Sequence, residues 1–206
     1  MIVCSIGCAT RGYEKAQATS DAITSASREV ELAWAQVSET TNALHALTSK
    51  PAAELQPAFE QYRKSIRALE KTVEDLRKKT AEMEQRGQTY FDTWNVRLGE
   101  ISNEDIRARS AERQREVTGQ FAEIQRRYQN AREKFEPLMS NLRDIHAALG
   151  VDLTPAGIES ARPFINRIDV AANTARTALE ELASSLRSLR TRLDPTSAPA
   201  PVTTAP

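Results

Sequence analysis

The chain has 206 residues, of which 27% are charged, and it contains only seven glycines. This composition is typical of long helices or of a coiled coil. Basic and acidic residues number 28 each, so the net charge predicts no attraction to nucleic acid or to anionic lipid. The sequence has no run of about 18 apolar residues and therefore predicts no membrane-spanning helix. The only cysteines are Cys4 and Cys8, which excludes a disulfide or a cysteine nucleophile in the rest of the chain.

The first eight residues end in Gly7-Cys8, which is typical of the processing site of a bacterial lipoprotein. We expect residues 1–8 to be the remnant of a signal and Cys8 to carry the lipid. The segment lacks a basic start and an apolar stretch of about 7 to 15 residues, so we interpret Met1 as a start within a longer signal. The alternative is an ordinary cytosolic N-terminus. Because Ala9 is not an aspartate, the lipoprotein interpretation favours the periplasmic face of the outer membrane.

Apolar residues recur in alternating steps of three and four through four successive segments, which predicts four long helices. The first begins near Tyr13 or Glu14 and ends at Ser49-Lys50-Pro51, because the residue before a proline avoids helical geometry. The second covers about residues 52–100. Residues 102–105 resemble an acidic capping box, which places the N-terminal cap of the third helix at Ser102.

The third helix is predicted over about residues 103–149, with Gly150 ending it and a kink at Pro137. Thr154 is the expected cap of the next helix. Pro163 predicts a short helix over 155–161 and a restart near Arg162, from which the fourth helix continues to residue 193. Residues 194–206 are rich in proline and poor in large apolar side chains, which predicts a disordered tail.

Short connections favour antiparallel neighbours, so residues 9–193 are expected to form one all-α domain. The predicted architecture is an elongated antiparallel four-helix coiled-coil bundle in up-down-up-down order. The second and third helices are predicted to be about 10 residues longer than the other two, so their shared turn should project roughly 15 Å beyond the bundle. That projection would lie at the same end as both chain termini.

The projecting hairpin carries aromatic residues on one arm and arginines on the other. Both residue types contribute strongly to interface energies, so the hairpin is a candidate surface for contact with a partner or a membrane. The predicted contact residues are Tyr90, Phe91, Trp94, Arg109 and Arg113. The alternative is that Tyr90 and Trp94 fill core positions and that the arginines pair with acidic residues of the same hairpin.

No arrangement in the sequence indicates catalysis or metal binding. His45 and His146 are the only histidines, they are expected near the surface at the opposite end of the bundle, and neither has the spacing of a metal ligand pair. The chain has no P-loop, dinucleotide-binding glycine motif or nucleophile elbow. Charged residues such as Glu74 and Arg77 are expected to pair on outward faces. The sequence therefore predicts no enzyme, no metal and no cofactor.

Several short motifs resemble a bacterial domain-of-unknown-function family, number 2959, of helical, lipoprotein-like envelope proteins. The resemblance covers about residues 7–193 and is carried by Gly7-Cys8, Tyr13-Glu14-Lys15, Tyr90-Phe91-x-x-Trp94, Arg109-Ser110-x-Glu112-Arg113-x-Arg115, Glu136-Pro137-Leu138 and Leu142-Arg143-Asp144. It implies a helical fold and an envelope location, and it supplies no catalytic or binding residues.

Together these features predict a non-enzymatic structural or protein-interaction module of the bacterial cell envelope, tethered through Cys8. Its expected partner is a protein or a membrane surface rather than nucleic acid, and self-association is compatible with the pattern. The alternative is a cytosolic coiled-coil adaptor or a self-assembling membrane-shaping protein, which would carry no lipid and would form a dimer.

Overall fold

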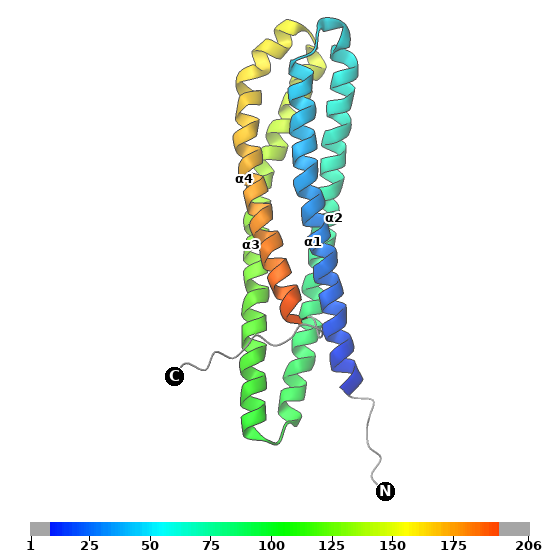
Figure 1. Cartoon of the computed structure of the whole chain (residues 1–206). Coiled ribbons are helices and arrows are strands. Elements are labelled where there is room, and N and C mark those ends of the chain that lie inside the picture. Colours follow the sequence, from blue (N-terminus) through cyan, green and yellow to red (C-terminus); the bar gives the residue numbers. More distant parts are fainter. Residues whose placement is uncertain (1–8, 194–206) are drawn as a thin grey trace.

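Residues 9–193 are described by a computed structural model, and they form four long helices (Figure 1). These are α1 (Ala9–Thr48), α2 (Leu55–Glu100), α3 (Glu104–Val151) and α4 (Pro155–Leu193), with a single short 3-10 helix, η2 (Ala52–Glu54), before α2. Within this part of the chain no strand occurs, so the predicted all-α fold is confirmed. The predicted lipid site at Cys8 and the predicted tail over 194–206 lie outside the described residues.

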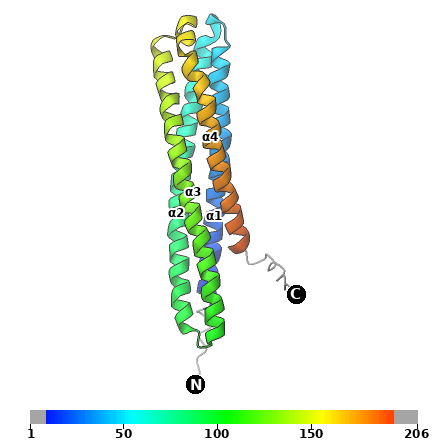
Figure 2. The same ribbon diagram turned by 90° about the vertical axis from the view of Figure 1, so that its left-hand side faces the viewer.

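Successive helices run in opposite directions along a narrow bundle (Figures 1 and 2). Helix α1 packs along both α2 and α4, and α3 packs along α4, whereas α2 and α3 contact each other much less. The predicted up-down-up-down order is therefore confirmed, and the unequal packing leaves one seam of the bundle, between α2 and α3, more open than the others.

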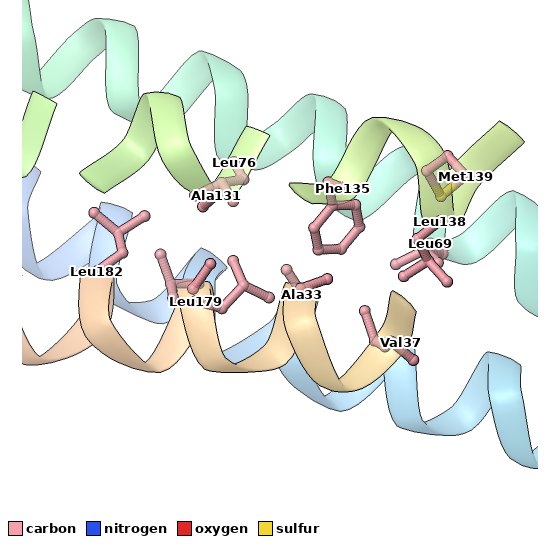
Figure 3. Packing of buried hydrophobic residues seen from close by; sticks show 14 of the residues in the cluster. Ala33, Val37, Leu69, Leu76, Ala131, Phe135, Leu138, Met139, Leu179 and Leu182 are labelled. Carbon is pink, nitrogen blue, oxygen red and sulfur yellow. The ribbon is translucent and has the colours of Figure 1, made fainter. Parts of the chain in front are cut away.

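The core is formed by the apolar stripes predicted from the sequence. Figure 3 shows side chains from all four helices meeting in the middle of the bundle, among them Val37 of α1, Leu69 of α2, Leu138 of α3 and Leu182 of α4. Each of these four is at most 1% exposed. Burying an aliphatic side chain of this size stabilises a fold by about 1.5–3 kcal/mol, so the stripes account for the tight packing along the bundle axis.

One polar group in the core links α2 to α3. The hydroxyl of Tyr62 donates a hydrogen bond of 2.9 Å to the backbone carbonyl of Leu142, and the Tyr62 ring is fully buried. Burial raises the pKa of Tyr62 well above its usual range, because the charged phenolate is poorly solvated there. The hydroxyl therefore stays protonated and remains a donor, as a buried tyrosine requires.

Two predicted helix caps have different outcomes. The prediction of Thr154 is confirmed, because its hydroxyl accepts a hydrogen bond of 3.1 Å from the backbone N–H of Gly157. The prediction of Ser102 is wrong by one residue. Asn103 has an extended backbone, and its side-chain oxygen accepts a hydrogen bond of 3.0 Å from the backbone N–H of Ile106. An asparagine makes this bond at least as well as serine.

The predicted break at Pro163 is also wrong, since α4 is one continuous helix from Pro155 to Leu193. A proline inside a helix removes one backbone hydrogen bond and crowds the carbonyl four residues earlier. Ile158 and Ile165, on either side of the proline, are both buried in the core, and their burial holds the two segments in line. Helix α3 continues through Pro137, where no break was predicted, and it ends at Val151, one residue beyond the predicted stop at Gly150.

Helices α2 and α3 extend past the beginning of α1 and the end of α4 (Figures 1 and 2). Helix α2 has 46 residues against 40 in α1, and α3 has 48 against 39 in α4. At 1.5 Å per residue these excesses correspond to about 9–14 Å. The projecting tip is confirmed, but it is shorter than predicted on the α1 side, because α1 begins at Ala9 rather than near Tyr13.

Charged residues pair along the outward faces as expected. Arg77 donates two hydrogen bonds of 3.0 Å to the carboxylate of Glu74, and this contact lowers the pKa of Glu74. Between helices, Arg143 of α3 reaches Glu70 of α2 at 2.8 Å. Exposed pairs of this kind contribute little to stability, so they mainly solvate the bundle and favour its register.

The candidate contact surface at the tip

The tip comprises residues 90–115 and has a core of its own. Its base is formed by Phe91, which is only 7% exposed. The Phe91 ring meets the Phe121 ring edge to face, with 5.5 Å between the centroids, a favourable aromatic geometry. The Phe121 ring in turn lies against the backbone of Gly87. Phe91 was predicted as a contact residue, but its position in the structure is that of a packing residue.

Tyr90 and Trp94 are half-buried and pack on each other, with 5.4 Å between the ring centroids. The indole N–H of Trp94 donates a hydrogen bond of 3.0 Å to the hydroxyl of Ser110 on the facing helix. Burial raises the pKa of Tyr90, against a smaller opposing effect of the Arg113 charge. Trp94 therefore joins α2 to α3, and both rings leave part of their surface exposed.

A buried amide also joins the two arms. The side-chain nitrogen of Gln114 donates hydrogen bonds to the side-chain oxygen of Asn95, at 2.7 Å, and to the backbone carbonyl of Phe91, at 3.3 Å. At the turn, the guanidinium of Arg107 donates to the backbone carbonyl of Ile101 at 3.1 Å. These contacts hold the two arms of the tip together.

The two arginines predicted as contact residues differ in their surroundings. Arg113 donates a hydrogen bond of 2.8 Å to the backbone carbonyl of Arg192 in the last turn of α4, and a second of 3.3 Å to Glu116. Arg113 therefore fastens the end of α4 to the side of the tip. Arg109 is exposed, and within the described residues it has no hydrogen-bond or ion-pair partner, which leaves its guanidinium available to a ligand.

Two apolar residues of the tip were missed in the sequence. Val96 is 65% exposed and Ile106 is 58% exposed. Both lie outside the heptad stripe, and an apolar, β-branched residue at an outward position would have been a usable signal. Ile106 and Arg109 are three residues apart on α3 and so lie on the same face of that helix. The free surface of the tip thus combines apolar side chains with an unpaired guanidinium.

The opposite end of the bundle holds the two histidines, as predicted. The Nε2 atom of His45 lies 2.8 Å from a carboxylate oxygen of Asp169. The His146 ring stacks on Phe59 with 5.0 Å between centroids. Over residues 9–193, no group of three or more histidine, cysteine, aspartate or glutamate side chains is placed to hold a metal ion, and none of the helices there is long and apolar enough to cross a bilayer.

Among the grooves along the side of the bundle, one of about 510 Å³ lies between the end of α3 and the beginning of α4. Another, of about 230 Å³, lies mainly in the open seam between α2 and α3 and has Tyr128 and Phe135 in its wall. Neither groove contains a predicted contact residue, so the tip and the grooves are separate surfaces.

Comparisons with known proteins give one match. No curated protein and no solved structure matches the chain. A family model, described as a protein of unknown function (DUF2959), matches residues 7–185. This match covers most of the described helices and includes the tip. The chain therefore belongs to the DUF2959 family.

Proposed function

We propose that the chain is a non-enzymatic interaction module of the bacterial cell envelope, tethered through a lipid on Cys8, which binds a protein partner through its tip. The observation that carries this proposal is the projection of α2 and α3 beyond α1 and α4, with Val96, Ile106 and Arg109 free on the projecting part. Exposed apolar side chains together with a guanidinium that has no partner among residues 9–193 form a combination suited to protein recognition.

The position of the tip fits the proposed tether. Helix α1 begins, and α4 ends, at the same end of the bundle as the turn between α2 and α3 (Figure 1). A lipid on Cys8, one residue before α1, would therefore hold the tip toward the membrane side. Acidic residues at the start of α3, Glu104 and Asp105, oppose direct binding to anionic lipid, so a protein partner near the membrane fits the tip better than the bilayer itself.

The second candidate function is a cytosolic adaptor or a self-assembling membrane-shaping protein. The long, narrow bundle is compatible with it, since many assemblies are built from such helices. The two candidates differ in one chemical respect, because only the envelope module carries a lipid on Cys8.

Removal of the free tip side chains should weaken partner binding while the bundle stays folded. We expect the triple variant Val96→Ser, Ile106→Ser and Arg109→Ser to recover at least about tenfold less crosslinked partner from the source organism, since truncating central interface residues costs about 2 kcal/mol or more. The measurement is quantitative affinity purification after crosslinking in cells. The variant should keep its helical circular dichroism, because these three side chains make few contacts within the bundle.

The matched control is Arg28→Ser with Leu32→Ser, which removes an exposed arginine and an exposed leucine from the side of α1. The control should recover as much partner as the wild type. The proposal would be contradicted if the tip variant recovered as much partner as the wild type, or if the control lost as much partner as the tip variant. The tip would then have only a structural role.

A further inference from the structure

The larger groove is formed by two helical faces that run antiparallel. Asp144, Ile145 and Ala148 line it from α3, and Ala161, Phe164 and Arg167 line it from α4. On α4 these residues are three positions apart, and on α3 Ala148 lies four positions after Asp144 and three after Ile145, so each set forms one continuous face. Ile145 and Ala161 are buried and form the floor. The groove is therefore an open furrow between two helices with an apolar floor.

One lining residue of this furrow is a large apolar side chain that is widely exposed. Phe164 is 57% exposed, and it lines the groove together with the buried Ile145 and Ala161. An exposed aromatic side chain next to an apolar floor in a concave surface indicates an interaction site more strongly than a single exposed apolar residue does. This end of the bundle is thus a candidate interface, distant from the tip.

Three charged residues line the furrow, and one of them, Asp152, accepts a hydrogen bond from the hydroxyl of Thr154. The other two, Asp144 and Arg167, have opposite signs. Asp144 is exposed and has no hydrogen-bond or ion-pair partner in the described part of the chain. Arg167 lies over the Phe164 ring, with 5.6 Å from its guanidinium carbon to the centroid, and it too has no carboxylate partner among residues 9–193. Many other arginines of the bundle pair with a glutamate on their own helix. The furrow therefore offers one free acid on α3 and one free base on α4.

We infer that the furrow between α3 and α4 is a self-association surface that binds the same furrow of a second copy of this chain. A two-fold interface brings one patch against its own copy, so that residue i meets residue j and residue j meets residue i. Asp144 of each copy then meets Arg167 of the other, while Phe164 fills the apolar floor of the opposite furrow. A single partner would thus pair both free charges and bury the exposed aromatic ring.

This arrangement makes a specific prediction for charge reversals. In a homodimer of Asp144→Arg, both 144–167 contacts would place one arginine against another. In a homodimer of Arg167→Asp, both contacts would place one aspartate against another. Each single variant should dimerise at least about 100-fold more weakly than the wild type, because like charges across an interface cost several kcal/mol. An equimolar mixture of the two variants should form a heterodimer, since every 144–167 contact then joins an arginine to an aspartate.

The test uses the unlipidated 206-residue chain, with sedimentation velocity for mass and native mass spectrometry of isotope-labelled copies for the composition of the dimer. Arg190→Asp, an exposed reversal near the other end of α4, is the control and should dimerise like the wild type. Circular dichroism should show that all variants remain helical. The inference is supported if the single variants are monomeric and their mixture is dimeric. It is overturned if the wild type stays monomeric up to about millimolar concentration, if the single variants still dimerise, or if the mixture does not. The tip is intact in every variant, so these results do not depend on the proposed function.

Discussion

Leucine in place of Gly87 is expected to lower the free energy of unfolding by about 3 kcal/mol, near the upper end of the cost of overpacking a core. A β-carbon at this position would lie 2.3 Å from the Cζ atom and 2.6 Å from the Cε2 atom of Phe121. The Phe121 ring cannot retreat easily, because it is buried and its neighbour is the Phe91 ring. For a chain of this length the loss corresponds to a fall of about 6–12 °C in Tm.

Gly119→Leu is the matched control for this effect. Gly119 is exposed in the first half of α3, and a β-carbon there would meet no atom within 4 Å. Because leucine is a better helix former than glycine by about 0.8 kcal/mol, this variant should be slightly more stable than the wild type. In Gly87→Leu with Phe121→Ala, the removal of the ring should recover part of the loss. Chemical denaturation followed by circular dichroism measures all three, and equal effects at positions 87 and 119 would contradict the packing described for the base of the tip.

Serine in place of Cys8 is expected to abolish lipid labelling entirely. The thiol is the only group on which the proposed lipid can be attached, and each buried methylene of an acyl chain contributes about 0.8 kcal/mol to membrane binding. Expressed from the full upstream reading frame in the source organism and fed a palmitate analogue, the wild type should be labelled and should sediment with membranes. Cys8→Ser should show neither property, whereas Cys4→Ser should show both. A wild type without label would favour the cytosolic alternative.

The helical architecture could be predicted closely because a seven-residue repeat constrains both secondary structure and packing. Ile168, Leu179 and Leu186 of α4 all belong to the repeat of apolar residues in steps of three and four, and all are buried. Local rules were less reliable where tertiary packing competes with them. At Pro163 the intrinsic cost of a proline predicted a break, but the burial of the flanking isoleucines keeps α4 continuous.

The candidate site could be predicted less well than the bundle, because the positions of α2 that are buried change near the tip. In the body of α2 the steps of the repeat lead to the core, and extending them predicts Tyr90 and Trp94 as core residues. Near the tip Phe91 is buried instead, and the other two rings are only partly buried. The furrow between α3 and α4 depends on how the faces of two different helices meet in space. The apolar repeat along the chain gives no information about that.

The most direct measurement of the central claim is site-specific photocrosslinking from the tip in the source organism. A photoreactive amino acid at position 106, in place of Ile106, should give a discrete adduct with a protein partner, and the adduct should disappear when Arg109→Ser is added to the same chain. The same amino acid at position 32, in place of the exposed Leu32 on α1, should give no such adduct. An adduct at position 32 that equals the one at position 106, or no adduct at position 106 at all, would contradict the assignment of the tip as the contact surface.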